Sequence, residues 1–304
     1  MRDPRAEAAA RVGHRFDVRV LEPSPPVVNE PPWFADDPLA GGEVLPIARQ
    51  GARTWADVCE EEADPELEAW CRDRWLVPRE PAPLPAAFDA TRRSLHALAE
   101  HVLAPARHAV TGKIGLRFTY RGFGTPFFGA GRQVRVDSGE LVDGDRRSAP
   151  ATLGAAADFL GAPLGAPADV YTPTTACTPD GPLDIDTDAA RALGDVFGLW
   201  GRLLEQVRAD ASSDDAPSRV QLWPEHFDLA VDLGPVGQRA NYGGSLGDEA
   251  HPEPYLYVGP WDMERLGPHV YWNEPFGASL SWMEIRCGAD PLAFLRQGKE
   301  LLSR

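Results

Sequence analysis

Several features common in chains of this size are scarce here. Lysine occurs only at Lys113 and Lys299 among 30 basic residues, which indicates the arginine bias of a GC-rich genome rather than a chemical need. No run of about 18 apolar residues exists, so the sequence predicts no membrane-spanning helix. Met1 to Phe16 contains no apolar core of a secretory signal. We therefore expect a soluble cytoplasmic protein.

Positive charge is also in short supply. The 30 basic residues face 46 acidic ones, which gives a formal net charge of −16. Binding to nucleic-acid backbones or anionic membranes requires basic patches. We therefore expect a small molecule as partner, and neither a nucleic acid nor a membrane. The oligomeric state is left open.

Cysteine is too sparse and too scattered to form a metal or disulfide framework. The four cysteines are Cys59, Cys71, Cys177 and Cys287, and none belongs to a CxxC pair. We expect free, buried thiols in a reducing compartment.

The chain divides by composition near residue 86. Residues 1–86 hold 13 of the 30 prolines, which exclude helix interiors and central strands. This segment also carries Trp33, Trp55, Trp70 and Trp75, although disordered tails are poor in aromatic residues. The sequence therefore predicts an N-terminal segment, 1–86, that docks its tryptophans on a body formed by residues 87–304.

The body shows one order of elements twice. Apolar spacing predicts helices at 88–104 and 188–209, and each is followed by alternating stretches typical of antiparallel strands and then by another helix. The fold class we predict is α+β, with duplicated halves at about 87–180 and 181–304. Gly194, Gly198 and Gly201 share one side of the second long helix, which predicts a close approach of backbone there. We expect His96, His101 and His108 at the surface.

Three short motifs follow one another in the body: LRFTYRG at 116–122, FDLAV at 227–231 and PEPYLY at 252–257. On these motifs the chain resembles a bacterial family known as a domain of unknown function, over about residues 88–304. The resemblance implies the domain boundary and the two-part layout, and it implies no reaction.

The stretch 223–277 concentrates the residues that could carry chemistry. Alternation along 227–233 puts Phe227 and Leu229 on one face, and His226, Asp228 and Asp232 on the other. The same parity in the next polar strand gathers His251, Tyr255 and Tyr257. Imidazole and carboxylate together suit zinc, iron or manganese. His226, Asp228 and His251 are therefore the predicted ligands of a divalent transition metal, in a pattern that resembles the HxD…H motif of iron- and 2-oxoglutarate-dependent oxygenases. The alternative is that these residues face water on the polar side of a sheet.

Gly243–Gly247 matches the GxSxG string of serine hydrolases. A nucleophile elbow needs a strand before the serine and a helix directly after it. Because Asp248–Pro252 offers no clean helix start, we interpret the glycine run as a flexible turn between strands.

Aromatic residues surround the same polar groups, as in a small-molecule pocket. Arg117 and Arg121 share a strand face with Thr119 in the first half, where they could meet the acidic residues of the second half or an anionic ligand. The predicted ligand-binding residues are Arg117, Arg121, Trp223, Tyr242, Tyr255, Tyr257, Trp261 and Trp272. The function we expect is small-molecule binding in a cleft lined by 223–277 and 117–121, with enzymatic use left open. The alternatives are a metal-dependent enzyme using His226, Asp228 and His251, and a non-catalytic protein-interaction module.

Overall fold

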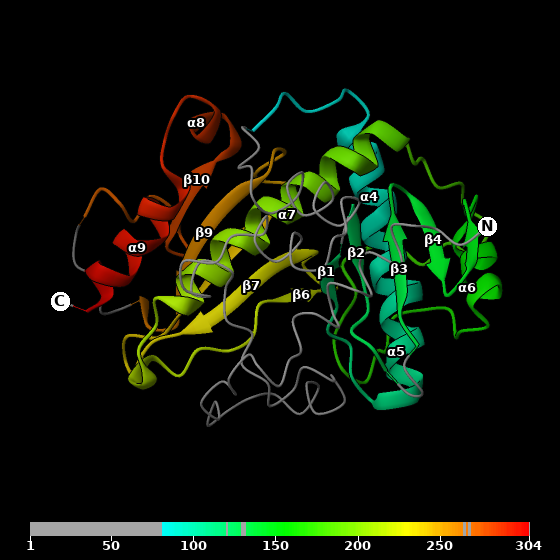
Figure 1. The fold of residues 1–304 in the computed structure, drawn as a ribbon, viewed down its shortest axis with the longest axis horizontal. Coiled ribbons are helices and arrows are strands. Elements are labelled where there is room, and N and C mark those ends of the chain that lie inside the picture. Colours follow the sequence, from blue (N-terminus) through cyan, green and yellow to red (C-terminus); the bar gives the residue numbers. More distant parts are fainter. Residues whose placement is uncertain (1–80, 120, 129–131, 264–265, 267–268, 304) are drawn as a thin grey trace, which may run out of the picture.

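Two antiparallel sheets of five strands form the centre of the chain in the computed structural model (Figure 1). The structure describes residues 81–119, 121–128, 132–263, 266 and 269–303. The predicted docking of Trp33, Trp55, Trp70 and Trp75, and the thiols of Cys59 and Cys71, lie outside these residues.

Each sheet is a meander in which strands adjacent in sequence are neighbours in space. The first contains β1 (Arg117–Thr119), β2 (Gly122–Gly124), β3 (Val134–Asp137), β4 (Glu140–Asp143) and β5 (Arg146–Ser148). The second contains β6 (Gln221–Trp223), β7 (Asp228–Leu233), β8 (Ala240–Ser245), β9 (Tyr255–Pro260) and β10 (Ala278–Ser281).

The two sheets meet at their first strands. Leu116, next to β1, and Leu222 of β6 exchange backbone hydrogen bonds of 2.8 and 3.0 Å in an antiparallel bridge. The two meanders therefore run outward from a shared centre.

Helices precede and follow each meander. They are α4 (Phe88–Leu98), the π-helical turn η4 (Ala99–Leu103), α5 (Ala104–Thr111), α6 (Leu153–Leu160), α7 (Thr187–Ala209), the short 3-10 turn η5 (Ser213–Asp215), α8 (Trp282–Arg286) and α9 (Pro291–Leu302). The predicted α+β class is confirmed, and the order helix, antiparallel strands, helix occurs twice. Descent from a duplication stays a prediction.

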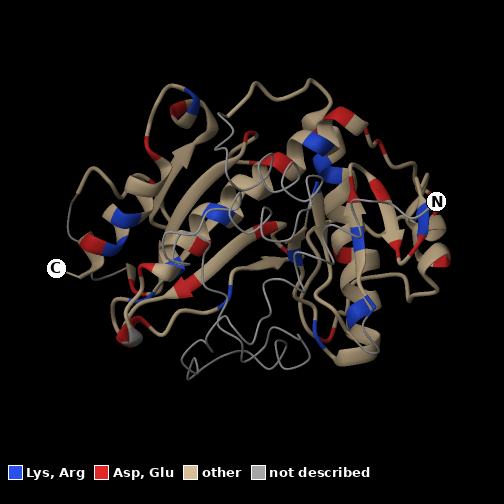
Figure 2. Cartoon of the chain, in the orientation of Figure 1, with Lys and Arg blue, Asp and Glu red and all other residues tan. Residues whose placement is uncertain are grey.

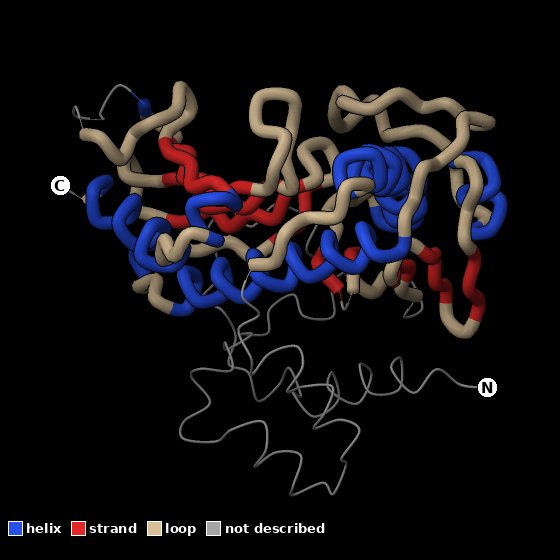
Figure 3. Tube along the Cα trace, turned by 90° about the horizontal axis from the view of Figure 1, so that it is seen from above, coloured by secondary structure: helices blue, strands red, loops and turns tan. Residues whose placement is uncertain are grey.

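Helix α7 ties the halves together. It contacts β1, β2 and β3 of the first sheet and β7 and β8 of the second, and it runs along one side of the described body (Figure 3). Its apolar face buries Leu193, Phe197, Trp200 and Leu204 completely. Phe197 also meets Phe123 and Phe227, one from each half, at ring-centroid distances of 6.3 and 5.4 Å.

The glycines of α7 do mark a close approach, as predicted. A β-carbon on Gly194 would overlap the backbone of Arg121 and come within 2.7 Å of the Gly122 nitrogen. A β-carbon on Gly201 would lie 3.0 Å from the Phe118 ring. The β1–β2 turn therefore rests on the glycine side of α7.

The first helix is longer than predicted. The apolar spacing predicts a helix that ends near residue 104, yet α4, η4 and α5 form one continuous helix that ends at Thr111. In η4 the Ala104 amide bonds to the Ala99 carbonyl, five residues back. This wider turn changes the hydrogen-bond register just before Pro105, which has no amide hydrogen to donate.

Register assigns the two faces of the second sheet. One face carries Leu222, Leu229, Leu256 and Leu280 in a single row across the strands and packs on the core. The opposite face carries the row Trp223, Asp228, Ser245, Tyr255 and Ser281, followed by the row Gln221, Ala230, Gly243, Tyr257 and Ser279. We call this opposite face, which carries both rows, the outer face.

Two local predictions about this sheet were wrong. The glycine run at 243–244 is not a flexible turn but the middle of β8. The apolar pattern at 280–287 predicts a strand through Cys287, but β10 ends at Ser281, which caps α8 through a reciprocal capping box with Glu284. The Ser-x-x-Glu signal therefore prevails over the local apolar pattern.

The surface of the described body is mixed in charge. Lysine and arginine are scattered over both halves among acidic residues (Figure 2). Cys177 and Cys287 are free, as expected, but exposed rather than buried. None of the helices in the described ranges combines the length and the apolarity that a bilayer crossing requires.

Candidate functional site

Asp228 begins β7 on the outer face of the second sheet, and it is only 5% exposed. Its Oδ2 atom accepts a hydrogen bond from the hydroxyl of Tyr257. That contact spans a strand, because Tyr257 lies on β9 and Asp228 on β7, with β8 between them. The residue of β8 opposite Tyr257 is Gly243, where a β-carbon would overlap the tyrosine ring. Gly243 therefore makes room for the contact.

The other oxygen of Asp228 is different. Oδ1 is buried and has no hydrogen-bond partner among the described residues. Burial raises the pKa of the Asp228 carboxyl, and the hydrogen bond from Tyr257, the nearby His226 imidazole and the backbone at Asp228 offset only part of that increase. A buried, half-satisfied carboxylate costs stability in a folded protein.

The turn that leads into β7 is unusual in its backbone. Phe227 has a φ of 52°, a conformation that bulky residues rarely adopt. Its ring is buried against Phe123, Phe197 and His96, and the preceding His226 is exposed. Phe227 turns into the core and His226 faces outward, as the alternation predicts, although both residues lie in the turn before β7 and not in the strand. Such outliers persist where surrounding structure holds them, often at functional sites.

Helix α4 lies against this turn. His96 Nε2 donates to the Pro224 carbonyl at 2.9 Å, and its ring stacks on Phe227 at 5.1 Å between centroids. Arg92, one turn earlier, donates to the Gly247 carbonyl at 2.8 Å. Burial lowers the pKa of His96 to about 4, so the ring is neutral at physiological pH. His96 was predicted at the surface, and that prediction was wrong.

A second carboxylate belongs to the same turn. Glu225 is half-buried, and its Oε2 atom has no hydrogen-bond partner among the described residues. Burial raises its pKa, the backbone at Glu225 and the His226 imidazole offset part of that increase, and the negative charges of Asp228 and Glu100 raise it further. We call His96, Glu225, His226 and Asp228 the junction cluster, because they lie where α4 meets the second sheet.

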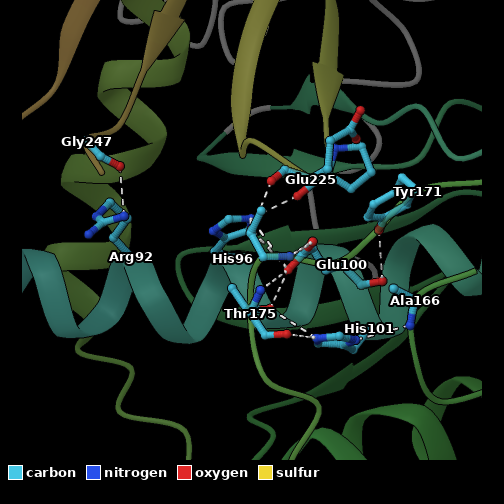
Figure 4. A network of polar contacts seen from close by, with 11 residues as sticks. Arg92, His96, Glu100, His101, Ala166, Tyr171, Thr175, Glu225 and Gly247 are labelled. Atoms are coloured by element: carbon cyan, nitrogen blue, oxygen red, sulfur yellow. Dashed lines mark hydrogen bonds and ion pairs between the residues drawn. The ribbon is translucent and has the colours of Figure 1, made fainter. Parts of the chain in front are cut away.

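The π-helical turn supplies a neighbouring network that the sequence did not reveal (Figure 4). Glu100 is fully buried and accepts hydrogen bonds from the amides of Thr174 and Thr175, at 2.9 and 2.7 Å. His101 is buried as well. Its Nδ1 accepts from the Ala166 amide at 3.1 Å, so its Nε2 carries the proton and donates to the Thr175 carbonyl at 3.0 Å.

This network fixes the long loop 161–186 beside the junction cluster. The Thr174 hydroxyl donates to the Glu225 carbonyl at 2.9 Å, so the loop contacts both halves. Loops of this length without regular structure are uncommon unless they serve a function. Glu100 and His101 sit on an apolar helix pattern, and only the tertiary contacts give them partners.

Two of the three predicted tyrosines, Tyr255 and Tyr257, lie next to the junction cluster and pack against each other. Tyr255, Tyr257, His251 and Phe276 form a closed chain of ring contacts, with centroid distances from 4.6 to 6.4 Å. We call them the tyrosine cluster. Tyr255 donates to Asp248 Oδ2 at 2.6 Å, and His251 Nε2 lies 2.9 Å from Glu274 Oε1.

The other predicted ligand-binding residues divide. Trp223 faces Asp228 across the β6–β7 pair. Tyr242 lies on the opposite face of the sheet and is 1% exposed in the core, so it does not join the other predicted residues on the outer face. Trp261 lies 63% exposed beyond the far end of β9 with its ring under Arg239, and Trp272 packs edge-on against Tyr271.

The two predicted arginines do not share a strand. Arg117 is in β1, and its charge acts on Glu205 of α7. Arg121 lies in the turn after β1 with a φ of 60°, and its backbone rests against Gly194 of α7. The predicted common face of Arg117, Thr119 and Arg121 was therefore wrong, because the chain turns at Arg121.

The predicted metal ligands are held apart by their own partners. Asp228 is bonded to Tyr257, and His251 is paired with Glu274. Within the described ranges, no three His, Cys, Asp or Glu side chains gather closely enough to hold a metal ion. The structure does not assemble His226, Asp228 and His251 into one site.

The serine of the GxSxG string is not placed as a nucleophile elbow requires. Ser245 closes β8, is 5% exposed, and accepts the Gly247 amide at 3.0 Å. A turn rather than a helix joins β8 to β9, and Asp248 Oδ1 accepts the amides of Ala250 and His251 there.

A surface hollow of about 440 Å³ lies along α9. It is lined by His269, Asp290, Ala293, Arg296, Gln297, Glu300 and Leu301. None of the predicted site residues lines it.

Comparison of the chain with protein-family models, with curated proteins and with solved structures found no match. The argument for function therefore rests on the geometry of the junction cluster.

Proposed function

We propose that this protein binds a small molecule at the junction cluster, with Asp228 as the anchoring group. The observation that carries the proposal is the Asp228 carboxylate, which is 5% exposed and has one oxygen without a partner among the described residues. Folding stability alone favours satisfying or removing such a group. A ligand that completes its hydrogen bonding explains why it is there.

Three further features at the same place support the proposal. Phe227 has a strained backbone, α4 continues into a π-helical turn, and the loop 161–186 is fixed against both halves. Strain, π-helical turns and long ordered loops each occur often at functional sites. They are separate in sequence, and here they gather around the turn 224–227 that leads into the buried Asp228.

A stability measurement distinguishes a binding role from a structural one. Asp228→Asn keeps an acceptor for Tyr257 and removes the buried charge, so we expect the free energy of unfolding at neutral pH to rise by about 1 kcal/mol. Asp137→Asn is the matched control, because Asp137 is 1% exposed but paired with Arg147 and Arg135. Loss of the Asp137 charge should lower the free energy of unfolding by about 3 kcal/mol. Denaturant unfolding of both variants gives the comparison.

The same variants then test binding. A fragment library of mixed charge, observed by ligand-detected nuclear magnetic resonance, should contain compounds that bind the wild type and not Asp228→Asn. Asp137→Asn at a temperature where it is folded should retain them. If Asp228→Asn loses stability as Asp137→Asn does, and no fragment separates it from the wild type, Asp228 is structural and the proposal is wrong.

A further inference from the structure

Two unfilled acceptors mark the junction cluster. Asp228 Oδ1 and Glu225 Oε2 are buried atoms without a hydrogen-bond partner among the described residues, and they belong to residues three apart in one turn. The third acid nearby, Glu100, is already filled by Thr174 and Thr175. Both atoms are carboxylate oxygens, so a ligand that fills them must supply hydrogen-bond donors and not acceptors.

The cationic side chains of the same region are engaged elsewhere. Arg92 uses its two terminal nitrogens on the Gly247 carbonyl and on Asp89. His96 donates to the Pro224 carbonyl and is neutral, as its lowered pKa of about 4 requires. The other basic side chain that acts on both Glu225 and Asp228 is the exposed imidazole of His226. Such a site attracts positive ligands and repels anions.

Aromatic surface stands beside these acceptors. Tyr257 is bonded to Asp228 through its hydroxyl, which fixes its ring next to the carboxylate. Phe276, in edge contact with Tyr257 at 6.4 Å, is 38% exposed. Ring faces next to carboxylates favour cations by adding a cation–π contribution to the ion pair.

We infer, building on the binding function proposed above, that the ligand is a small organic cation that donates several N–H hydrogen bonds, such as an amidinium or guanidinium group. Its N–H groups would fill Asp228 Oδ1 and Glu225 Oε2, and its planar charge would lie against the aromatic rings. A planar, forked donor matches two acceptors from one turn better than a single-atom charge does. A quaternary ammonium carries the same charge and has no N–H to donate.

Four aromatic compounds of similar size test this inference by varying only the head group. Benzamidine has charge and N–H donors, benzyltrimethylammonium has charge alone, benzamide has N–H donors alone, and benzoate is an anion. Their affinities are measured by chemical-shift titration of the labelled full-length protein. We expect benzamidine to bind about tenfold more tightly than any of the other three.

Variants locate the binding. Asp228→Asn and Glu225→Gln should each weaken benzamidine by about tenfold and leave the weak benzamide shifts unchanged. Asp145→Asn, an exposed turn carboxylate of the first sheet, is the control and should change nothing.

The outcomes separate this inference from the proposed function. If benzamide or benzoate binds as tightly as benzamidine and depends on Asp228, the ligand class is wrong while the binding function stands. If benzyltrimethylammonium equals benzamidine, charge alone decides and the N–H requirement is wrong. If benzamidine binding is unaffected by either variant, the cation site is not at the junction cluster and the inference fails, whatever the fragment library shows.

Discussion

His96 shows how burial sets the chemistry of a single residue. Its ring lies between Phe227 and the Pro224 carbonyl, with 12% of the side chain exposed. Desolvation disfavours the imidazolium form and lowers the pKa from 6.5 to about 4. In the unfolded chain His96 takes up a proton below pH 6.5, whereas in the folded protein it does so only near pH 4.

Acidification should therefore destabilise the fold through His96. Between pH 6.5 and pH 4 the unfolded state binds the proton and the folded state does not, so the free energy of unfolding falls as the pH falls. The loss attributable to His96 is on the order of 3 kcal/mol. In His96→Gln, which keeps a donor for Pro224, the stability difference from wild type should shrink across this range. Urea unfolding at several pH values measures it.

The comparison needs a histidine of the same helix as control. His108 lies at the end of α5 and is half-buried, so His108→Gln controls for replacing a histidine of this helix, and the effect assigned to His96 is the difference between the pH profiles of the two variants. An unchanged profile in His96→Gln would show that His96 is not held neutral by the fold.

At the scale of elements, α7 depends on where its glycines face. Gly194 and Gly198 lie one turn apart on the same helix, yet they meet different neighbours. A β-carbon on Gly194 would overlap the backbone of Arg121, whereas one on Gly198 would lie 3.8 Å from the Phe118 ring, an ordinary contact.

The two alanine substitutions should therefore have opposite effects. Gly198→Ala gains helix propensity without a clash and should raise the free energy of unfolding by up to about 1 kcal/mol. Gly194→Ala forces the β1–β2 turn away from α7 and should lower it by about 1–3 kcal/mol. Thermal and denaturant unfolding report both values. Equal effects in the two variants would contradict the close packing of α7 on this turn.

At the scale of the whole molecule, the halves share too much to unfold separately. Helix α7 covers strands of both sheets, the Leu116–Leu222 bridge joins their first strands, and Phe123 meets Phe227 at 5.0 Å. In the part of the chain that the structure describes, both halves contribute side chains to one hydrophobic core.

Truncation of either core should therefore shift one common transition. Val136→Ala removes two buried methyl groups from the first sheet, and Leu256→Ala removes a buried side chain from the second. They should lower the free energy of unfolding by about 1–2 and 2–5 kcal/mol, respectively. In calorimetry of the full-length protein, each variant should shift the same single transition of the body. Two resolved transitions, each sensitive to only one variant, would show that the halves are independent.

Local patterns in the sequence were enough to place most helices and the α+β class. The spacing of Leu193, Phe197, Trp200 and Leu204 specifies the buried face of α7, because a helix repeats every 3.6 residues wherever it packs. Local patterns failed where a tertiary contact overrides the local preference of the chain. The glycines of β8 predict a turn from local sequence alone, but they lie in a strand because Tyr257 packs over Gly243 and Trp200 packs over Gly244. The first helix continues through Pro105 because the π-helical turn before it changes the hydrogen-bond register.

The candidate site also contains residues that the local sequence predicted and residues whose roles depend on tertiary contacts. Strand parity in the sequence identified Asp228, Tyr255, Tyr257 and His251 as polar groups on one side of a sheet, because alternation depends only on the chain itself. It gave no indication of Glu100 and Glu225, and His96 was predicted at the surface. Those three gain their roles from a helix, a loop and a turn that are distant in sequence. Burial, and with it the pKa of His96 and the unfilled oxygen of Asp228, is a property of the packed molecule, and only the tertiary structure decides it.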